Sequence, residues 1–414
     1  MSCDHGNPSR SAAAMTTPVP YEQTPYRRSL PDDPPLAWDP RDAPPRLNVF
    51  VPHLSMKHSF GGVASALELG GVLAGRYPEA RFLSLSPLPP ELFDLPSLVR
   101  GQTRVSPAPE SCADGPIACH ARDVFFCTYW PTVLAWRRHA GFMERAGHAA
   151  NPFYYFIQDW EPGFYPMGAK QMIAESTYGH GDDCFAVFNS QELACHFQQK
   201  GYGLSRTATL SPSLNQTLRE ILAAWNFQLP PKSAHRMRLL VYGRPHQPRN
   251  CFAVILEGLA RYLSALPGNE RGALDLVSAG LEHESIELAP GAVMASLGKL
   301  SLKDYAALLA QSHVGVSLMA SPHPSYPPLE MAAFGLEVVT NGYACKDLSR
   351  AHPYIRSVSS PEPGEIAREL ELAVQAARQR AGRAETARLP ENLSPEPWDR
   401  NIRSARLPRL DPVV

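Results

Sequence analysis

The residues from Val314 to Asn341 combine a carboxylate, a proline-rich loop and two apolar runs, and they give the first indication of chemistry. Val314–Met319 has the length of a buried strand, and the prolines after it disfavour a helix until Pro327 and Pro328. These two prolines suit a first helical turn, and we predict the helix itself over Leu329–Gly335. In open α/β sheets, a loop of this kind binds ligands, and the helix N-terminus attracts anions such as phosphate.

Glu330 lies in the first turn of that predicted helix, so its carboxylate is expected to face the same crevice. One interpretation makes it a functional acid. The alternative is that it only stabilises the helix N-terminus, an effect worth about 0.3–1 kcal/mol. Ser325 and Tyr326 precede the helix and are candidate binding residues.

Two other segments are candidates for binding a diphosphate. Gly61 and Gly62 open a helix after the first strand, where glycine lets the backbone approach a phosphate; the alternative is a plain turn. The pair lacks the G-x-G-x-x-G pattern, which disfavours NAD. Arg244 and Arg249 follow a strand in the second half, and guanidinium groups bind diphosphate oxygens in pairs; the alternative is solvent-facing arginines. Their neighbours Gly243 and Asn250 complete this candidate set.

An aromatic segment follows the predicted strand Phe153–Ile157. Aromatic faces stack on sugars, and carboxylates accept hydrogen bonds from sugar hydroxyls. The segment is therefore a candidate wall of a sugar-binding site, on the side of a saccharide that would accept a transferred group. The alternative is a surface loop with aromatic residues packed beneath it. The candidate residues are Gln158, Asp159, Trp160 and Glu161.

Strands and helices alternate along the chain, which predicts parallel sheets covered on both faces. Residues 1–46 are rich in proline and lack apolar periodicity, and we predict them to be largely disordered. Residues 47–229 and 237–389 form two Rossmann-like halves separated by Pro230-Pro231, and residues 390–414 return to the first half.

Composition excludes several classes of protein. The chain has 414 residues, enough for two domains, and its 39 basic and 40 acidic residues give no indication of nucleic-acid binding. Its eight cysteines contain no C-x-x-C pair, so no zinc site or disulfide framework is expected, and a reduced cytoplasm is the default location. No apolar run approaches the ~18 residues of a membrane span.

SPHPSYPPLEMAAFG, which contains Glu330, resembles the donor-site segment of family 4 glycosyltransferases with the two-domain GT-B fold, and is most similar to the rhamnosyltransferase WsaF group. The resemblance covers most of the chain from Leu47 to Ser360. Six further segments contribute to it and occur in the expected order along the chain: FGGV, DVFFCTYWPT, YYFIQDWEPGFYP, FAVFNSQEL, VYGRPHQPRN and GKLSLKDYAALLAQS.

The resemblance implies an α/β GT-B enzyme that transfers a sugar, L-rhamnose from dTDP-L-rhamnose, to a glycan or lipid-linked saccharide with retention. Glu330 would bond the ribose, Lys299 and Leu300 would lie near the base and phosphates, and the glycines would close over the diphosphate. Asp159 is a candidate acceptor-side base. The family normally has two glutamates in this segment, and the first of them orients the transferred sugar. In this sequence, Pro322 stands at the position of that first glutamate.

No Asp-x-Asp triplet follows a strand, so we expect no metal and no other cofactor. Two alternatives remain: a UDP- or GDP-hexose donor, or a catalytically silent module that binds a nucleotide or glycan. The basic stretch 377–388 is most simply a solvated helix face, and peripheral contact with the inner membrane face is the lesser alternative.

Overall fold

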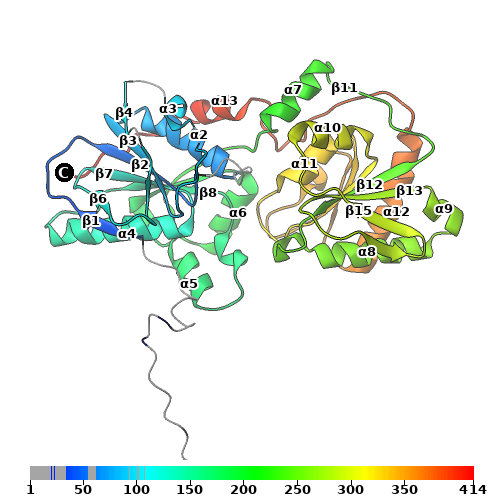
Figure 1. The fold of residues 1–414 in the computed structure, drawn as a ribbon, viewed down its shortest axis with the longest axis horizontal. Helices are drawn as coiled ribbons and strands as arrows, with labels where there is room; N and C mark the ends of the chain where they lie inside the picture. Colours follow the sequence, from blue (N-terminus) through cyan, green and yellow to red (C-terminus); the bar gives the residue numbers. More distant parts are fainter. Residues whose placement is uncertain are drawn as a thin grey trace, which may run out of the picture.

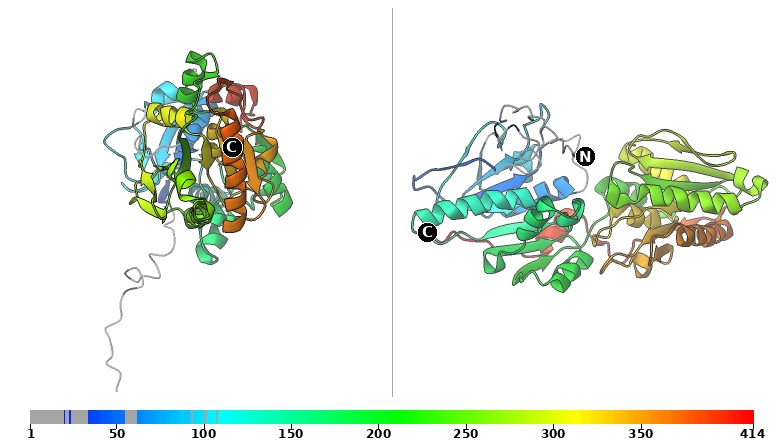
Figure 2. Two further views of the ribbon diagram at one scale, coloured as in Figure 1. Left: turned by 90° about the vertical axis from the view of Figure 1, so that its right-hand side faces the viewer. Right: turned by 90° about the horizontal axis from the view of Figure 1, so that it is seen from below.

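The computed structural model describes residues 20, 23, 34–54, 62–92, 94–99, 102–106 and 108–414. They form two α/β lobes that lie side by side (Figure 1, Figure 2). Gly61, one of the predicted site residues, lies outside the described residues.

The N-terminal lobe contains an eight-stranded sheet with the order β10-β9-β8-β7-β2-β3-β4 and with β5 paired to β3. All pairings among its described strands are parallel. The central strands are buried along their whole length, as expected for a sheet covered on both faces. The strands are β2 (Arg46–Val51), β3 (Glu79–Ser84), β4 (Arg104–Val105), β5 (Glu110–Ser111), β7 (Asp123–Cys127), β8 (Phe153–Ile157), β9 (Cys184–Phe188) and β10 (Arg206–Thr209).

Helices cover both faces of this sheet and bury two apolar clusters against it. The helices are α2 (Gly62–Ala74), α3 (Leu95–Leu98), α4 (Trp130–Arg145), α5 (Ala169–Ser176) and α6 (Gln191–Lys200), with 3-10 turns η3 (Glu161–Phe164) and η4 (Gly181–Asp183). A small parallel pair, β1 (Leu36–Trp38) and β6 (Ile117–Cys119), lies beside the main sheet.

The C-terminal lobe contains a seven-stranded sheet with the order β14-β15-β13-β12-β16-β17-β18. Its described pairings are parallel except for the edge pair β14 and β15. The strands are β12 (Met237–Gly243), β13 (Leu274–Gly280), β14 (Ile286–Ala289), β15 (Ala292–Ser296), β16 (Val314–Val316), β17 (Glu337–Asn341) and β18 (Ile355–Val358). The helices are α8 (Phe252–Ala265), α9 (Gly268–Gly272), α10 (Leu302–Gln311), α11 (Tyr326–Ala333) and α12 (Pro363–Arg380), with 3-10 turns η5 (Pro248–Asn250) and η6 (Leu348–Arg350).

The chain crosses between the lobes twice. It first passes through α7 (Gln216–Ala224) and β11 (Gln228–Leu229), and β11 pairs with β19 (Glu385–Thr386). It then returns, and α13 (Trp398–Ser404) packs beside α2 (Figure 1). Beyond α13, the Tyr77 hydroxyl donates to the Leu410 carbonyl at 2.7 Å, and the Tyr154 hydroxyl donates to the Pro408 carbonyl at 2.7 Å. The last residues are therefore packed into the first lobe.

The predicted parallel sheets are confirmed, and three local predictions about elements are wrong. The strand predicted over Val314–Met319 ends at Val316. The region predicted to be disordered extends too far, because Leu36–Trp38 pairs with β6. The helix predicted from Leu329 begins at Tyr326, since proline is accepted inside a first turn as well as before it. Glu330 is consequently in the second turn of α11.

Candidate active site

The two lobes meet at a buried carboxylate. Asp159 follows β8 of the N-terminal lobe, and its side chain accepts a hydrogen bond from Arg249 Nη1 at 2.8 Å and another from the Ser321 hydroxyl. Arg249 lies in η5 of the C-terminal lobe, and its guanidinium also lies over the ring of Phe164, 4.3 Å from the centroid. The structure therefore brings a predicted acceptor-side acid into direct contact with a predicted diphosphate-binding arginine.

The loop that carries Ser321 is held by side chains from the end of β17. The Asn341 side chain accepts from the Met319 N–H at 2.7 Å and donates to the Met319 carbonyl at 3.2 Å. Lys346 Nζ donates to the same carbonyl at 2.6 Å. Lys346 is buried, which lowers its pKa to about 8, and the nearby charge of Asp159 opposes that shift. Sequence reasoning did not identify Asn341, Lys346 or Ser321 as site residues; a polar side chain at the end of a buried strand was the available signal.

His323 lies in the same loop in one fixed orientation. Its N–H donates to the Ser321 hydroxyl at 3.0 Å, and its Nδ1 accepts from the Ser325 N–H at 3.0 Å. Burial lowers the pKa of His323 to about 4, so the ring is neutral near pH 7. Ser325 adopts φ of 68°, an unusual backbone geometry for a residue other than glycine and one that accumulates at functional sites.

Glu330 is a half-buried side chain on α11. Burial raises its pKa to about 7, while interaction with the Tyr305 hydroxyl of α10 lowers it. Its charge also reaches Tyr242 near the end of β12, where the pKa of Tyr242 is raised by burial and lowered by Arg244. Near neutral pH, both protonation states of Glu330 are therefore populated, and the carboxyl group can accept or donate a hydrogen bond.

Gly62 and Gln158 are brought together in the N-terminal lobe. A Cβ atom at Gly62, the first residue of α2, would lie 2.7 Å from Gln158 Oε1, so a larger residue there would have to displace the end of the Gln158 side chain. Across the junction, Tyr326 interacts with the Ser65 hydroxyl of α2, and its pKa is raised by burial and by the charge of Glu330. The N-terminus of α2 thus lies against the start of α11.

Two of the predicted acceptor-side residues are bound within the N-terminal lobe. Trp160 Nε1 donates to the Tyr202 hydroxyl at 2.8 Å. Glu161 is buried, and its carboxylate accepts from the Trp130 N–H at 2.7 Å and from the Tyr155 hydroxyl at 3.1 Å. Burial raises the pKa of Glu161 to about 8. The hydrogen bonds of both side chains stay inside the lobe rather than crossing the junction.

The remaining predicted donor-side residues differ in their surroundings. Gly243 ends β12, and a Cβ atom there would lie 2.0 Å from Ser278 Oγ, so packing between strands already requires glycine. Asn250 is buried, and its Nδ2 donates to the Leu318 carbonyl at 3.5 Å. Lys299 is exposed and Leu300 half-buried, in the loop between β15 and α10.

A disulfide joins the lobes beside these residues. Cys195 of α6 is bonded to Cys345, which lies between β17 and η6, with a Cα–Cα distance of 6.2 Å. The sequence led us to expect no disulfide, and that expectation is wrong. The two cysteines are 150 residues apart, so no spacing pattern could reveal the pair.

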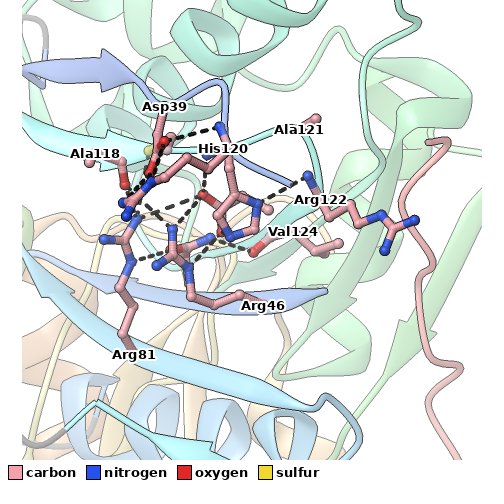
Figure 3. Close-up of polar contacts among 12 residues, drawn as sticks. Asp39, Arg46, Arg81, Ala118, His120, Ala121, Arg122 and Val124 are labelled. Atoms are coloured by element: carbon pink, nitrogen blue, oxygen red, sulfur yellow. Dashed lines mark hydrogen bonds and ion pairs between the residues drawn. The ribbon is translucent and has the colours of Figure 1, made fainter. Parts of the chain in front are cut away.

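A second buried polar cluster lies at the opposite edge of the N-terminal sheet, at the amino ends of its strands (Figure 3). Asp123, the first residue of β7, accepts hydrogen bonds from Arg46 Nε at 2.8 Å and Nη2 at 2.9 Å. It also accepts from the His120 N–H at 2.9 Å, while Arg81 Nη2 lies 3.8 Å away. Burial alone would raise the pKa of Asp123, but the hydrogen bonds and charge of Arg46, with the charge of Arg81, lower it to about 2.

The described part of the chain contains no group of three or more His, Cys, Asp or Glu side chains placed to hold a metal ion. None of its helices has the length and apolar content needed to cross a membrane. In the basic stretch 377–388, Arg378, Arg380 and Arg388 form ion pairs with Glu270, Glu385 and Glu391.

Comparison with known proteins gives matches over most of the chain. The family models described as "WsaF, N-terminal domain" and "WsaF, C-terminal domain" match residues 46–191 and 237–371. The O-antigen biosynthesis protein RfbC of Myxococcus xanthus is 30% identical over 302 residues, which cover 73% of this chain and 21% of that protein. The chain therefore spans about a fifth of the length of this relative.

Solved structures resemble the fold at low sequence identity. Sucrose-phosphate synthase (tll1590) from Thermosynechococcus elongatus has a TM-score of 0.51 and 13% identity, with 87% of this chain and 94% of that chain covered. WaaG, a glycosyltransferase involved in lipopolysaccharide biosynthesis, has a TM-score of 0.47 and 13% identity, with 86% and 94% covered. Together with the two parallel-sheet lobes, the first of these likenesses confirms the predicted GT-B fold.

Proposed function

Because the chain belongs to the WsaF family of glycosyltransferases, we propose that it transfers L-rhamnose from dTDP-L-rhamnose to a glycan or lipid-linked saccharide. The name of its relative RfbC supports a role in the synthesis of a surface polysaccharide. The observation that carries the proposal is the contact between Asp159 and Arg249, because it brings the aromatic segment of one lobe against the arginine loop of the other.

In this proposal, the donor binds to the C-terminal lobe at the carboxyl ends of its strands. Arg244 and Arg249 pair with the diphosphate, with Lys299 at its periphery, since guanidinium groups bind such oxygens in pairs. Glu330 accepts hydrogen bonds from the ribose hydroxyls. The start of α2, at Gly62, approaches the diphosphate from the other lobe, where the end of the Gln158 side chain lies against the glycine.

The chemical step needs charge neutralisation at the leaving diphosphate. The arginines and the N-terminus of α11 are fixed donors directed at the position where that charge develops, which is the electrostatic mode of catalysis. We propose a retaining, metal-independent, family 4 reaction in which the leaving phosphate takes the acceptor proton. A protein nucleophile is then unnecessary, and Asp159 remains the candidate acceptor-side base.

Two alternative functions are each compatible with a specific observation. Pro322 at the position of the first family glutamate is compatible with a UDP- or GDP-hexose donor whose sugar is oriented differently. The same substitution, with Asp159 bonded to Arg249, is compatible with a silent module that binds a nucleotide or glycan. Peripheral membrane contact is the weakest proposal, because three arginines of the stretch 377–388 are paired with acids.

A panel of nucleotide sugars tests the proposal. Hydrolysis or transfer would be measured for dTDP-L-rhamnose, UDP-hexoses and GDP-hexoses, each with and without EDTA. We expect turnover of dTDP-L-rhamnose alone and no change with EDTA. Turnover of a hexose donor would establish the first alternative, and nucleotide binding without turnover would establish the second. Loss of activity in EDTA that magnesium or manganese restores would contradict metal independence.

A further inference from the structure

The disulfide between Cys195 and Cys345 crosses the junction at which the proposed substrates meet. Cys195 lies on α6, which faces the C-terminal lobe (Figure 1), and Cys345 follows β17. Their Cα–Cα distance of 6.2 Å is within the range that disulfides require, so the closed lobes hold the two residues in bonding position without rearrangement. The other five cysteines in the described part of the chain are free.

The bond is attached to the elements that build the site. Cys345 is followed by Lys346, whose Nζ donates to Met319 in the loop that carries Ser321. On the other side, His196, the residue after Cys195 on α6, packs against Trp160 of the aromatic segment with ring centroids 5.5 Å apart. A covalent link between these two points restrains both lobes next to the contact between Asp159 and the arginine loop.

The lobes must separate at this place for a substrate to enter. The Asp159 carboxylate accepts from the Ser321 hydroxyl and from Arg249 Nη1, and Arg249 is a group that the proposed donor would otherwise contact. Hydrogen bonds of this kind break and re-form as domains open and close, on the microsecond to millisecond scale. A disulfide does not open on that timescale, so its presence decides whether the junction can open at all.

We propose that Cys195 and Cys345 form a reversible thiol–disulfide switch that locks the glycosyltransferase in its closed form. In the locking step, the two thiols react with a low-molecular-weight disulfide, RSSR. One Cys195–Cys345 bond forms, the RSSR bond breaks, and two RSH molecules leave with the two thiol protons. A dithiol reverses the reaction and is itself oxidised to a cyclic disulfide. Both cysteines are half-buried at the surface, which leaves them accessible to such reagents.

The redox state can be tested without any substrate. The purified protein would be treated with oxidised glutathione or with dithiothreitol, alkylated under native conditions, and mapped by peptide mass spectrometry. We expect a Cys195–Cys345 peptide only after oxidation and alkylation of both residues only after reduction. Alkylation of both cysteines in the glutathione-treated protein would overturn the proposal.

Opening of the junction is measured by hydrogen exchange in the same two samples. We expect amides in residues 158–164 and 317–325 to exchange on the order of tenfold faster in the reduced protein, because opening exposes them. Cys195→Ser and Cys345→Ser should exchange at the reduced rate in both samples. Cys251→Ser, which alters another half-buried cysteine near the junction, should keep the difference. Equal exchange in oxidised and reduced protein would overturn the lock.

Turnover gives the functional measurement, with the nucleotide sugar that the donor panel identifies. Oxidised protein should turn over on the order of tenfold more slowly than reduced protein, because release and entry require opening. The Cys195→Ser variant should be insensitive to glutathione. An oxidised form that retains full turnover would contradict the switch. The mapping and exchange results do not depend on the identity of the donor, so an error in the proposed donor would leave them unaffected.

Discussion

Two groups of buried carboxyl side chains lie at opposite ends of the N-terminal sheet, and their pKa values are shifted in opposite directions. Asp123 receives charge-assisted hydrogen bonds from Arg46 within its own lobe, and its pKa falls to about 2. Close to the junction, burial dominates: the pKa of Glu161, which is bonded inside the N-terminal lobe, rises to about 8, and that of Glu330, on α11 of the C-terminal lobe, rises to about 7. The first arrangement fixes a structure, while the second leaves groups that can change protonation or partner.

The position of each cluster on the sheet explains the difference. Arg46 and Asp123 begin adjacent parallel strands, so the register of the sheet holds their side chains together. The junction residues leave the carboxyl ends of strands in loops from two lobes, where no shared register exists and where α/β proteins bind ligands. Charges at the amino ends can therefore be paired permanently, whereas charges at the carboxyl ends are available to a ligand.

The largest expected effect comes from breaking the paired cluster. Asp123→Ala leaves the half-buried Arg46 without its carboxylate and the His120 N–H without its acceptor, while Arg81 keeps its ion pair with Glu110. This loss should destabilise the protein by about 3–5 kcal/mol. The measurement is chemical denaturation at pH 7. The matched control is Glu79→Ala, which removes the partner of the exposed Arg104 and should cost about 0–1 kcal/mol. Similar losses for the two variants would mean that the pairing at Asp123 contributes no more to stability than an exposed ion pair.

The next largest effect should appear in binding rather than in stability. Under the proposed function, Glu330→Gln would weaken a hydrogen bond to a ribose hydroxyl worth roughly 1.5–3 kcal/mol, so nucleoside diphosphate affinity should fall on the order of 10- to 100-fold. Calorimetry would measure the affinity, together with the melting temperature. A variant that melts earlier yet binds the nucleotide as tightly as the parent would make Glu330 a purely structural residue.

The pH dependence of stability should distinguish the clusters by sign. The pKa of Glu161 rises from 4.5 to about 8 on folding, so its contribution is fully present below pH 4.5 and is lost as pH rises toward 8. The unfolding free energy of the parent protein should therefore fall between pH 5.5 and 8. In Glu161→Gln, that fall should be smaller by at least about 1 kcal/mol. Asp123 behaves oppositely, because its contribution is lost only as pH falls from 3.8 through about 2. An unchanged pH profile in the Gln variant would contradict this assignment.

The smallest expected effect tests whether the carboxylate at the junction competes with the donor. Asp159→Asn removes the negative charge that occupies Arg249, so nucleoside diphosphate should bind on the order of tenfold more tightly. Calorimetry with the parent and variant would measure this change. Unchanged affinity would mean that a donor does not displace Asp159.

Local sequence patterns predicted the sheet strands well and the junction poorly. The bounds of β8 agree with the strand predicted over Phe153–Ile157, because this strand is a continuous apolar run with clear ends. The pairing of Asp159 with Arg249 joins residues 90 positions apart in different lobes, and no periodicity encodes such a contact. The positive φ of Ser325 was also unpredictable, since it arises from hydrogen bonds that the folded loop imposes on a residue that normally avoids it.

The return of the C-terminal segment to the first lobe has a consequence for synthesis on the ribosome. The Leu410 N–H donates to the Tyr154 hydroxyl of β8 across 256 residues of chain. At roughly 5–20 residues per second, Tyr154 therefore waits on the order of 10–50 s after its own synthesis before that partner is made. The second lobe is translated within that interval and can fold first. The N-terminal lobe, although it is translated first, is the last part of the molecule to be completed.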